Sequence, residues 1–138
     1  MSSFNLEILT PGKQIFNDSV QEVIIPAYDG ETGILAGHEN FVGLLGTGAL
    51  KIVREGNDYW FVISSGVWEV RGGNVSVLAE LAEGSDAFDV EAESSKLEEL
   101  KSSFTKLDLS SPEGEKAKAN YDRAQARLDV HKRTSLVN

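Results

Sequence analysis

The chain has 138 residues, of which 41% are apolar and 25% are charged, which is typical of a globular protein with one ordinary domain or a compact domain plus an appendage. Its net charge of −9 argues against sequence-independent binding of nucleic acid or anionic lipid, and the absence of cysteine excludes disulfides, thiol catalysis and thiolate metal sites. No run of 18 apolar residues is present, so we expect no segment that inserts directly into a membrane.

Before about residue 85, apolar side chains alternate in short runs separated by glycine, which predicts β-strands. The runs that we expect to form strands are 4–9, 20–25, 34–35, 49–53, 59–63, 67–70 and 75–81. The turns that separate several of these runs are expected at 11–12, 55–58 and 72–74. We expect Pro26 to end the second strand, because proline has no N–H to donate to a neighbouring strand. Seven or more short strands predict a β-sandwich or flattened barrel over residues 1–84.

Two glycine-rich segments follow the second strand. Residues 28–40 are expected to form a structured surface loop in which His38 is exposed. No second histidine or cysteine lies at ligand spacing from His38, so we expect no metal site there. Residues 43–48 suggest a phosphate-binding loop, but no Lys-Ser/Thr pair and no helix follow, so turns between strands are the better interpretation.

After about residue 85 the apolar period changes to three and four residues, which predicts helices. Asp86 or Asp89 is expected to cap the first helix. Its apolar stripe is expected to contain Leu97, Leu100, Phe104 and Leu107. Ser111 is expected to cap a second helix, with Pro112 at the first helical position. Because the break between the helices is short, residues 85–138 predict an antiparallel helical hairpin.

The predicted seam of the second helix is mostly alanine, which buries little apolar area. The residues of this seam are Ala117, Tyr121, Ala124, Leu128 and His131. We therefore hypothesise that the hairpin docks weakly on the β-domain and exchanges between a folded-down and an extended state. The alternative is a permanently docked hairpin that completes the fold.

The charge is distributed unevenly along the chain. Residues 1–84, 85–112 and 113–138 carry net charges of −7, −4 and +2. The last segment can rest on the acidic body of its own chain or on another acidic surface. Its bases are Lys116, Lys118, Arg123, Arg127, Lys132 and Arg133. Arg123 and Arg127 lie one helical turn apart, where they can bind a phosphate or a carboxylate.

Three segments resemble motifs of one known family, the epsilon subunit of bacterial F-type ATP synthases, called delta in mitochondria. Residues 30–38 are similar to the family's loop motif except at Thr32 and Ala36, and residues 62–71 and 74–79 are similar to two further motifs. The resemblance covers essentially the whole chain, in order. It implies a non-catalytic central-stalk subunit that couples the gamma subunit to the c-ring and restrains ATP hydrolysis through mobile C-terminal helices.

The resemblance also implies partners for particular residues. His38, Phe41 and Val42 are expected to pack on the gamma subunit, and Glu31 is expected to lie by the c-ring. The six bases of residues 113–138 are expected to contact acidic segments of the catalytic beta subunits when the hairpin is extended, and the alpha subunits are expected among the partners. The expected location is peripheral, on the cytoplasmic face of the bacterial inner membrane.

Some members of the family bind ATP on the hairpin, and the corresponding candidates here are Asp89, Arg123 and Arg127. Ala92 stands where the family's signature has an arginine, and Glu91 and Glu93 would repel polyphosphate, so ATP binding is disfavoured. We expect no other cofactor and no metal. The rival interpretation from a different class is a small ligand-binding β-barrel with a dimerising hairpin. Because no nucleophile with a partner base appears, an enzyme is the weakest interpretation.

Overall fold

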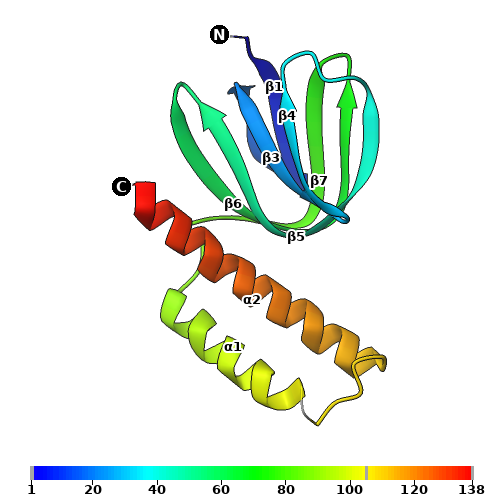
Figure 1. The fold of residues 1–138 in the computed structure, drawn as a ribbon, viewed down its shortest axis with the longest axis vertical. Coiled ribbons are helices and arrows are strands. Elements are labelled where there is room, and N and C mark those ends of the chain that lie inside the picture. The colour runs from blue at the N-terminus through cyan, green and yellow to red at the C-terminus, as the bar shows by residue number, and fades with distance from the viewer. Residues whose placement is uncertain (1, 105, 138) are drawn as a thin grey trace.

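The structure is a computed structural model that describes residues 2–104 and 106–137. It has a β-domain of seven strands followed by two helices, which lie below the strands in Figure 1. The expected fold class, an N-terminal β-sandwich or flattened barrel followed by an antiparallel helical hairpin, is confirmed.

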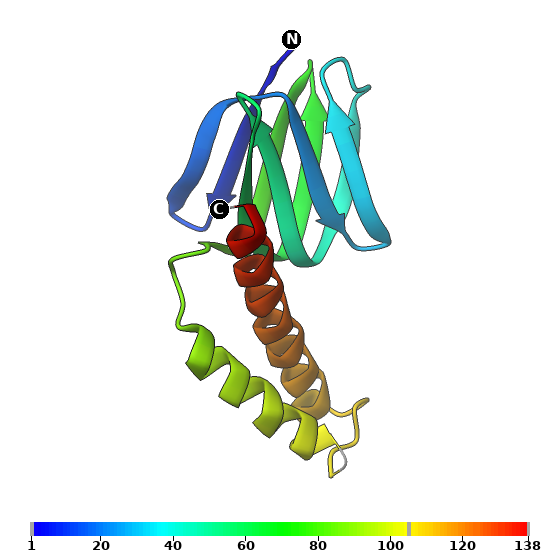
Figure 2. The ribbon, with the colours of Figure 1, turned by 60° about the vertical axis from the view of Figure 1, so that its left-hand side comes forward.

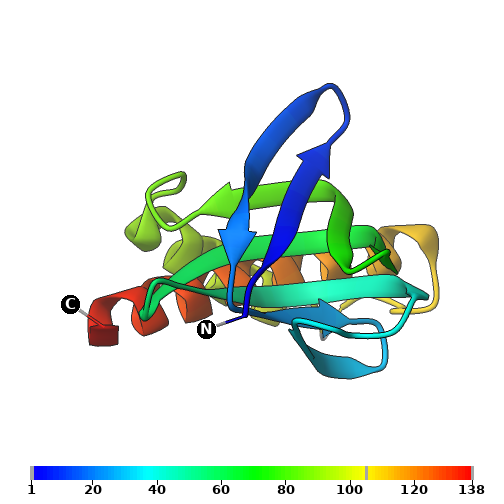
Figure 3. The same ribbon diagram turned by 90° about the horizontal axis from the view of Figure 1, so that it is seen from above.

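The strands form one continuous, strongly curled sheet. Their bounds are β1 Phe4–Thr10, β2 Lys13–Val20, β3 Glu22–Ala27, β4 Gly30–Leu35, β5 Phe41–Arg54, β6 Asn57–Arg71 and β7 Asn74–Gly84. The order in the sheet is β2-β1-β7-β6-β5-β3-β4, in which β1 and β7 pair in parallel and the other neighbours pair antiparallel. Seen from above in Figure 3, the β1–β2 hairpin crosses β5 and β6 at a steep angle. The curl encloses an aliphatic core that includes Leu6, Ile8, Ile34, Leu50 and Ile63, each with no exposed surface.

Two long strands carry the sheet from one layer to the other. The expected strands 59–63 and 67–70 are parts of the single strand β6, and the glycine-rich residues 43–48 lie inside β5, so the expected turns there are wrong. β6 bends at Ser65 and Gly66, whose φ angles are 57° and 135°. A Cβ at Gly66 would collide with the carbonyl oxygen of Leu78, so this bend requires glycine.

The strands differ from the expected ones in two further ways. The strand β2 was not expected, because as an edge strand it buries only Val20 fully and lacks a clear alternation. Pro26 lies inside β3 and does not end it. The pairing of β3 with β5 is irregular between Ile24 and Ala27, and an irregularity of this kind accommodates a residue that has no N–H.

The two predicted hairpin turns are confirmed, and both use residues with positive φ. Glu55 and Gly56 connect β5 to β6 with φ angles of 53° and 79°. Gly72 and Gly73 connect β6 to β7 with φ angles of 58° and 82°. These values match the two-residue turns whose twist suits paired antiparallel strands.

The helices are α1 Val90–Phe104 and α2 Pro112–Val137. Asp89 caps α1, since its Oδ1 accepts hydrogen bonds from the backbone N–H groups of Glu91 (2.9 Å) and Ala92 (3.4 Å). Ser111 caps α2 by accepting from the N–H of Gly114 at 3.1 Å, as predicted. Leu107 follows the end of α1, so its expected place in the helix is wrong.

Only one helix packs closely on the sheet. α2 lies across β5 and β6, and α1 packs against α2 on the side away from the strands, as Figure 2 shows. The ring of Phe104 on α1 meets that of Tyr121 on α2, with centroids 5.1 Å apart. The position of the whole hairpin therefore depends mainly on the contact between α2 and the sheet.

Candidate functional site

Two surfaces of the molecule carry the residues that the sequence singled out, and the first is an exposed apolar face. Four large apolar side chains, Tyr28, Phe41, Val42 and Leu44, are 76%, 49%, 65% and 60% exposed. We call these four residues the apolar face. A contiguous set of exposed apolar side chains is typical of a surface that binds another protein.

The alternation of β5 explains the exposure of Val42 and Leu44. Leu45 points into the core and is 4% exposed, whereas Val42 and Leu44 point outward. Tyr28, in the turn between β3 and β4, is held beside them because its N–H donates to the carbonyl of Leu44 at 2.9 Å. The ring of Phe41 stacks on that of buried Trp68, with centroids 4.9 Å apart. Backbone pairing and stacking therefore fix an apolar surface that the core does not use.

A groove of about 520 Å³ runs beside the apolar face and brings together the three residues expected at the gamma subunit. His38, Phe41 and Val42 all contribute to its lining. His38 is half-buried, not exposed as expected, and its Nδ1–H donates to the carbonyl oxygen of Glu39 at 2.7 Å. Glu31 does not join this groove. It is exposed on β4 and lines a separate cavity of about 340 Å³ between the sheet and α2.

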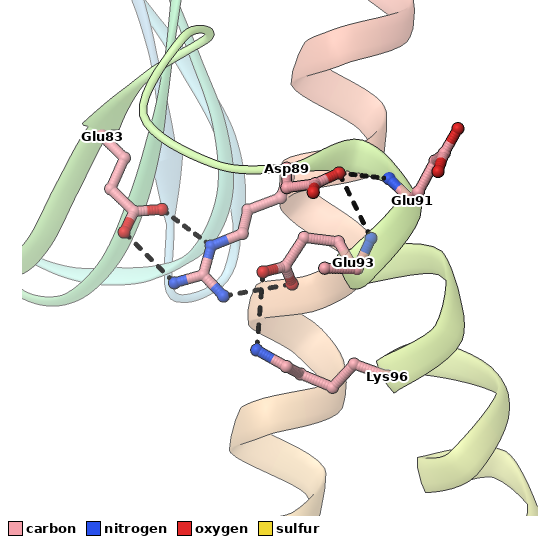
Figure 4. Close-up of polar contacts among 7 residues, drawn as sticks. Glu83, Asp89, Glu91, Glu93 and Lys96 are labelled. Carbon is pink, nitrogen blue, oxygen red and sulfur yellow. Dashed lines mark hydrogen bonds and ion pairs between the residues drawn. The ribbon is translucent and has the colours of Figure 1, made fainter.

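The second surface is the contact between α2 and the β-domain, where Arg127 has the central place. Its Nε–H donates to Glu83 at 2.7 Å and a terminal N–H donates to the other oxygen of Glu83 at 3.2 Å. A further N–H donates to Glu93 on α1 at 3.2 Å, and Lys96 approaches Glu93 at 3.4 Å. Figure 4 shows these carboxylates converging from β7 and α1. We call Glu83, Glu93 and Arg127 the Arg127 cluster.

Burial makes the Arg127 cluster stronger than an ordinary surface ion pair. Glu93 is 6% exposed as a residue, and the side chain of Arg127 is 14% exposed. The hydrogen bonds that Arg127 donates to Glu83 raise the pKa of Arg127 above its usual value, and the charges of Glu83 and Glu93 act in the same direction. Because bidentate pairs of this type are both stronger and more specific in geometry, the cluster fixes three elements relative to one another.

Arg123 and a small apolar patch complete the contact. The Nε–H of Arg123 donates to the hydroxyl of Ser64 at 3.1 Å, beside the bend of β6. The apolar part consists of buried Val62, Ala126 and Val130, with Ala49, Trp60, Leu81 and Phe88 around them. Ala126 and Val130 lie outside the predicted alanine seam. Ala126 and Val130 follow Arg123 and Arg127 by three positions each, so they lie on the same side of the helix as these arginines. The sequence contains this spacing, but no feature of the sequence indicates that this second face of the helix is buried.

The other four bases of α2 remain at the surface. Lys116 and Lys132 are exposed, Lys118 pairs with Asp122 at 3.2 Å, and Arg133 pairs with Asp129 at 2.9 Å. The guanidinium of Arg133 also lies 4.9 Å from the centre of the Trp60 ring. In this conformation, therefore, Arg123 and Arg127 form hydrogen bonds with their own β-domain, and Arg133 contacts it through the ring of Trp60.

The three candidate ATP residues are engaged in internal contacts. Asp89 caps α1, Arg127 is held by two carboxylates, and Arg123 donates to Ser64. Glu83, which the sequence did not indicate, and Glu93, which it indicated only as a repulsive charge, take the place that a bound anion would have beside Arg127. ATP binding at these residues, which the sequence disfavours, stays a hypothesis.

Two other classes of site, metal centres and membrane-spanning helices, are addressed by the described parts of the chain. Over residues 2–104 and 106–137, no group of three histidine, aspartate or glutamate side chains is placed to hold a metal ion. Within the same residues, neither helix has both the length and the apolar character that crossing a membrane requires.

Comparison with known proteins gives a consistent match. The family model for the β-sandwich domain of the ATP synthase delta/epsilon chain matches residues 3–85. The ATP synthase epsilon chain of Synechococcus sp. (strain CC9311) is 34% identical over 96% of this chain and 99% of its own length. That of Prochlorococcus marinus (strain MIT 9211) is 36% identical over 94% and 98%. The epsilon chain of Nitratidesulfovibrio vulgaris is 39% identical, but over only 64% of this chain.

Solved structures share the fold. A chain from the mitochondrial ATP synthase of Euglena gracilis, in a structure of OSCP, F1 and the c-ring, aligns with a TM-score of 0.72 and 24% identity. The alignment covers 99% of this chain and 81% of that one. A chain from the central stalk and c-ring of the Tetrahymena thermophila enzyme aligns with a TM-score of 0.57 and 13% identity, over 97% of both chains.

Proposed function

We infer that this chain, which belongs to the ATP synthase delta/epsilon family, is a non-catalytic subunit of the central stalk of an F-type ATP synthase. The observation that carries this conclusion is the match along nearly the full length of both chains to an ATP synthase epsilon chain, at 34% identity. A stalk subunit transmits force through its shape and its contacts. The rigid β-domain with a separate apolar face suits that task.

The apolar face is the surface that we assign to the gamma subunit. His38, Phe41 and Val42 meet there around one groove, and the exposed apolar area beside it needs a cover in the assembled enzyme. Glu31 lies apart from this groove on β4, so the same β-domain can contact a second partner there. We assign that partner as the c-ring.

The helical hairpin is the part that we assign to control of ATP hydrolysis. In the folded-down state, Arg123 and Arg127 bind the β-domain, whereas Lys116 and Lys132 are exposed. When the hairpin extends, all six bases become available to acidic segments of the beta subunits and to the alpha subunits next to them. The two states compete for the same arginines, so the neighbouring subunits decide which state is populated.

The complex to which the relatives belong is a membrane-associated ATP synthase. We place this chain on it as a peripheral subunit, at the cytoplasmic face of a bacterial inner membrane. The chain itself makes no direct insertion into the bilayer in this assignment.

Removal of residues 85–138 tests the assignment in the assembled enzyme. We expect the shortened chain to co-purify with the gamma subunit and the c-ring, because its β-domain is intact, while ATP hydrolysis by the complex rises. Lys116→Ala and Lys132→Ala in the full chain should relieve inhibition in part, because these bases are exposed in the folded-down state, and added salt should weaken inhibition as well. Unchanged hydrolysis would remove the regulatory role, and a free homodimer that ignores the other stalk subunits would overturn the stalk assignment itself.

A further inference from the structure

One contact between α2 and the β-domain is made by a short side chain in a fixed position, the hydroxyl of Ser64. Ser64 is 1% exposed on β6 and pairs across the sheet with Thr47 on β5. The two hydroxyl oxygens lie 2.9 Å apart, and the Nε–H of Arg123 donates to the oxygen of Ser64 at 3.1 Å. A polar group of α2 is therefore bound to the buried surface of the sheet itself.

The other acceptors that the β-domain offers to the arginines of α2 have more freedom. Glu80 is exposed, and its carboxylate lies 3.8 Å from Arg123. Glu83 binds Arg127. A glutamate side chain has several rotatable bonds, so its carboxylate can follow a small movement of the helix. The hydroxyl of Ser64 is attached to the Cβ of a residue inside a strand and is bonded to a neighbouring strand, so it cannot follow.

The contacts of α2 follow one order along the helix and along β6. Arg123 binds Ser64 at one end, and the guanidinium of Arg133 lies 4.9 Å from the centre of the Trp60 ring at the other. From Arg123 to Arg133 the helix rises about 15 Å, and from Trp60 to Ser64 the strand extends about 13 Å. Because these two lengths agree, both contacts form together in one register of α2 on the sheet.

The apolar patch between these two contacts does not select that register by itself. Its buried members, Val62, Ala126 and Val130, are short side chains of similar size. Apolar contacts between side chains of similar size lose little when they repack. The face of the Trp60 ring also attracts a cation over a range of positions. The register therefore depends on the directional hydrogen bond to Ser64.

The pair of hydroxyl groups also makes this contact reversible. Arginine can only donate, so the oxygen of Ser64 accepts from Arg123. When α2 leaves the sheet, the hydroxyls of Ser64 and Thr47 still have each other as partners. A buried polar group left without a partner would make release of the helix costly, and Ser64 avoids that cost.

We propose that Ser64 is a positioning residue for α2: its hydroxyl, held by Thr47, accepts from Arg123 and fixes the place of the helix along β6 in the folded-down state. This inference rests on the proposed function, in which the extended hairpin restrains ATP hydrolysis. It adds a residue of the β-domain that sets the balance between the two states. Loss of the Ser64 hydroxyl then favours extension of the hairpin.

Hydrogen–deuterium exchange of the isolated full chain tests the proposal with Ser64→Ala. We expect the protection of α2 to fall about tenfold, at the low end for a hydrogen bond to a charged group because Arg123 is partly exposed, and the strands to stay unchanged. In a chain that already has Arg123→Ala, the same change should add little, because its donor is gone. Unchanged protection in Ser64→Ala, or additive losses in the double variant, would overturn the proposal.

A matched control comes from another serine of the sheet. Ser76 is half-buried near the start of β7, at the opposite end of that strand from Glu83. Ser76→Ala removes a hydroxyl of the same kind and should leave the protection of α2 as it is. Equal losses in Ser64→Ala and Ser76→Ala would show a general effect on the sheet and would contradict a role of Ser64 in docking.

The indole ¹⁵N–H signals of the two tryptophans measure the position of α2 away from the substitution. Trp60 contacts Arg133, whereas Trp68 is buried and serves as the reference. Val130→Ala weakens docking through the apolar patch and shows how simple release moves the Trp60 signal. We expect Ser64→Ala to move that signal in a different direction, because α2 changes its register, and to leave Trp68 in place. Movement in the same direction would overturn the positioning role.

The rate of ATP hydrolysis by the assembled enzyme separates this inference from the function on which it rests. Ser64→Ala should lower the rate, the opposite of removing residues 85–138, because more hairpins are extended. If exchange shows the loss of docking but hydrolysis is unchanged or faster, the proposed regulatory function is overturned and the positioning role of Ser64 stands. If exchange shows no loss of docking, the positioning role alone is overturned.

Discussion

The β-domain and the helical hairpin are held by different kinds of contact. The β-domain encloses a continuous core of 17 buried apolar residues, whereas the contact between α2 and the sheet buries three, Val62, Ala126 and Val130. The hairpin adds the Arg127 cluster to this small patch. Apolar burial contributes roughly 25 cal/mol per Å², so the β-domain holds most of the stability of the described chain.

The difference has a functional meaning. A large apolar core cannot open without unfolding, so the β-domain can transmit force. A small patch combined with ion pairs can be exchanged for contacts of similar strength on another acidic surface, since only the difference between the two states counts. The same chain can thus contain a rigid coupling part and a replaceable regulatory part.

The largest expected effect comes from a change inside the β-domain. Leu50→Ala removes a side chain with no exposed surface, so we expect a loss of about 2–5 kcal/mol in the free energy of unfolding. Leu128→Ala on α2 is the matched control, because Leu128 is half-buried and should cost much less. Urea unfolding followed by circular dichroism measures both. Equal losses would show that the hairpin is as integral to the fold as the core.

The next effect should appear in the hairpin alone. Arg127→Ala leaves Glu93 without its main partner in a buried position, so docking should weaken by about 3 kcal/mol while the β-domain stays folded. Hydrogen–deuterium exchange should then be faster along α2 and unchanged in the strands. Lys132→Ala is the control, since Lys132 is exposed and should leave exchange as it is. Faster exchange in both parts together would contradict the separation of the two regions.

A smaller effect is expected at the junction between the two parts. Asp89→Ala removes the cap of α1 and should cost about 1 kcal/mol of local helix stability. Asp86→Ala, three residues earlier, removes an exposed carboxylate without a role in the cap and should change little. Amide exchange of the first turn of α1 distinguishes them. If Asp86→Ala has the larger effect, the helix begins differently in solution.

The smallest expected effect concerns pH. Because the pKa of Arg127 is raised in the folded chain, the contribution of its charge is complete below the usual arginine value and is lost only as the pH rises through the higher value. Raising the pH from about 7 to about 9 should therefore leave docking of α2 unchanged. The exchange rates of α2, corrected for their intrinsic dependence on pH, measure this. Release of the helix in that window would mean that another group controls docking.

Local sequence rules predicted the features that depend on a few neighbouring residues. Ser111 and Pro112 began α2 as expected, and Gly72 and Gly73 formed a tight turn because few other residues accept their φ angles. The same rules were wrong where the pairing of strands that are distant in the sequence determines the local structure. Pro26 is tolerated at an irregularity in the pairing of β3 with β5, and nothing near Pro26 in the sequence indicates that irregularity.

For this protein, the sequence by itself determined the two-part fold and the family, whereas the binding of a partner by His38, Phe41 and Val42, which line one groove, stays a prediction. Only the tertiary structure decided which partners the arginines of α2 take, because Arg127 lies 44 residues from Glu83 and 34 residues from Glu93. It also decided that Trp68 on β6 pairs with Gly43 on the neighbouring strand β5. Periodicity records which side chains are buried, but the partner of a buried charge or donor depends on how separate elements pack, and that information is not local.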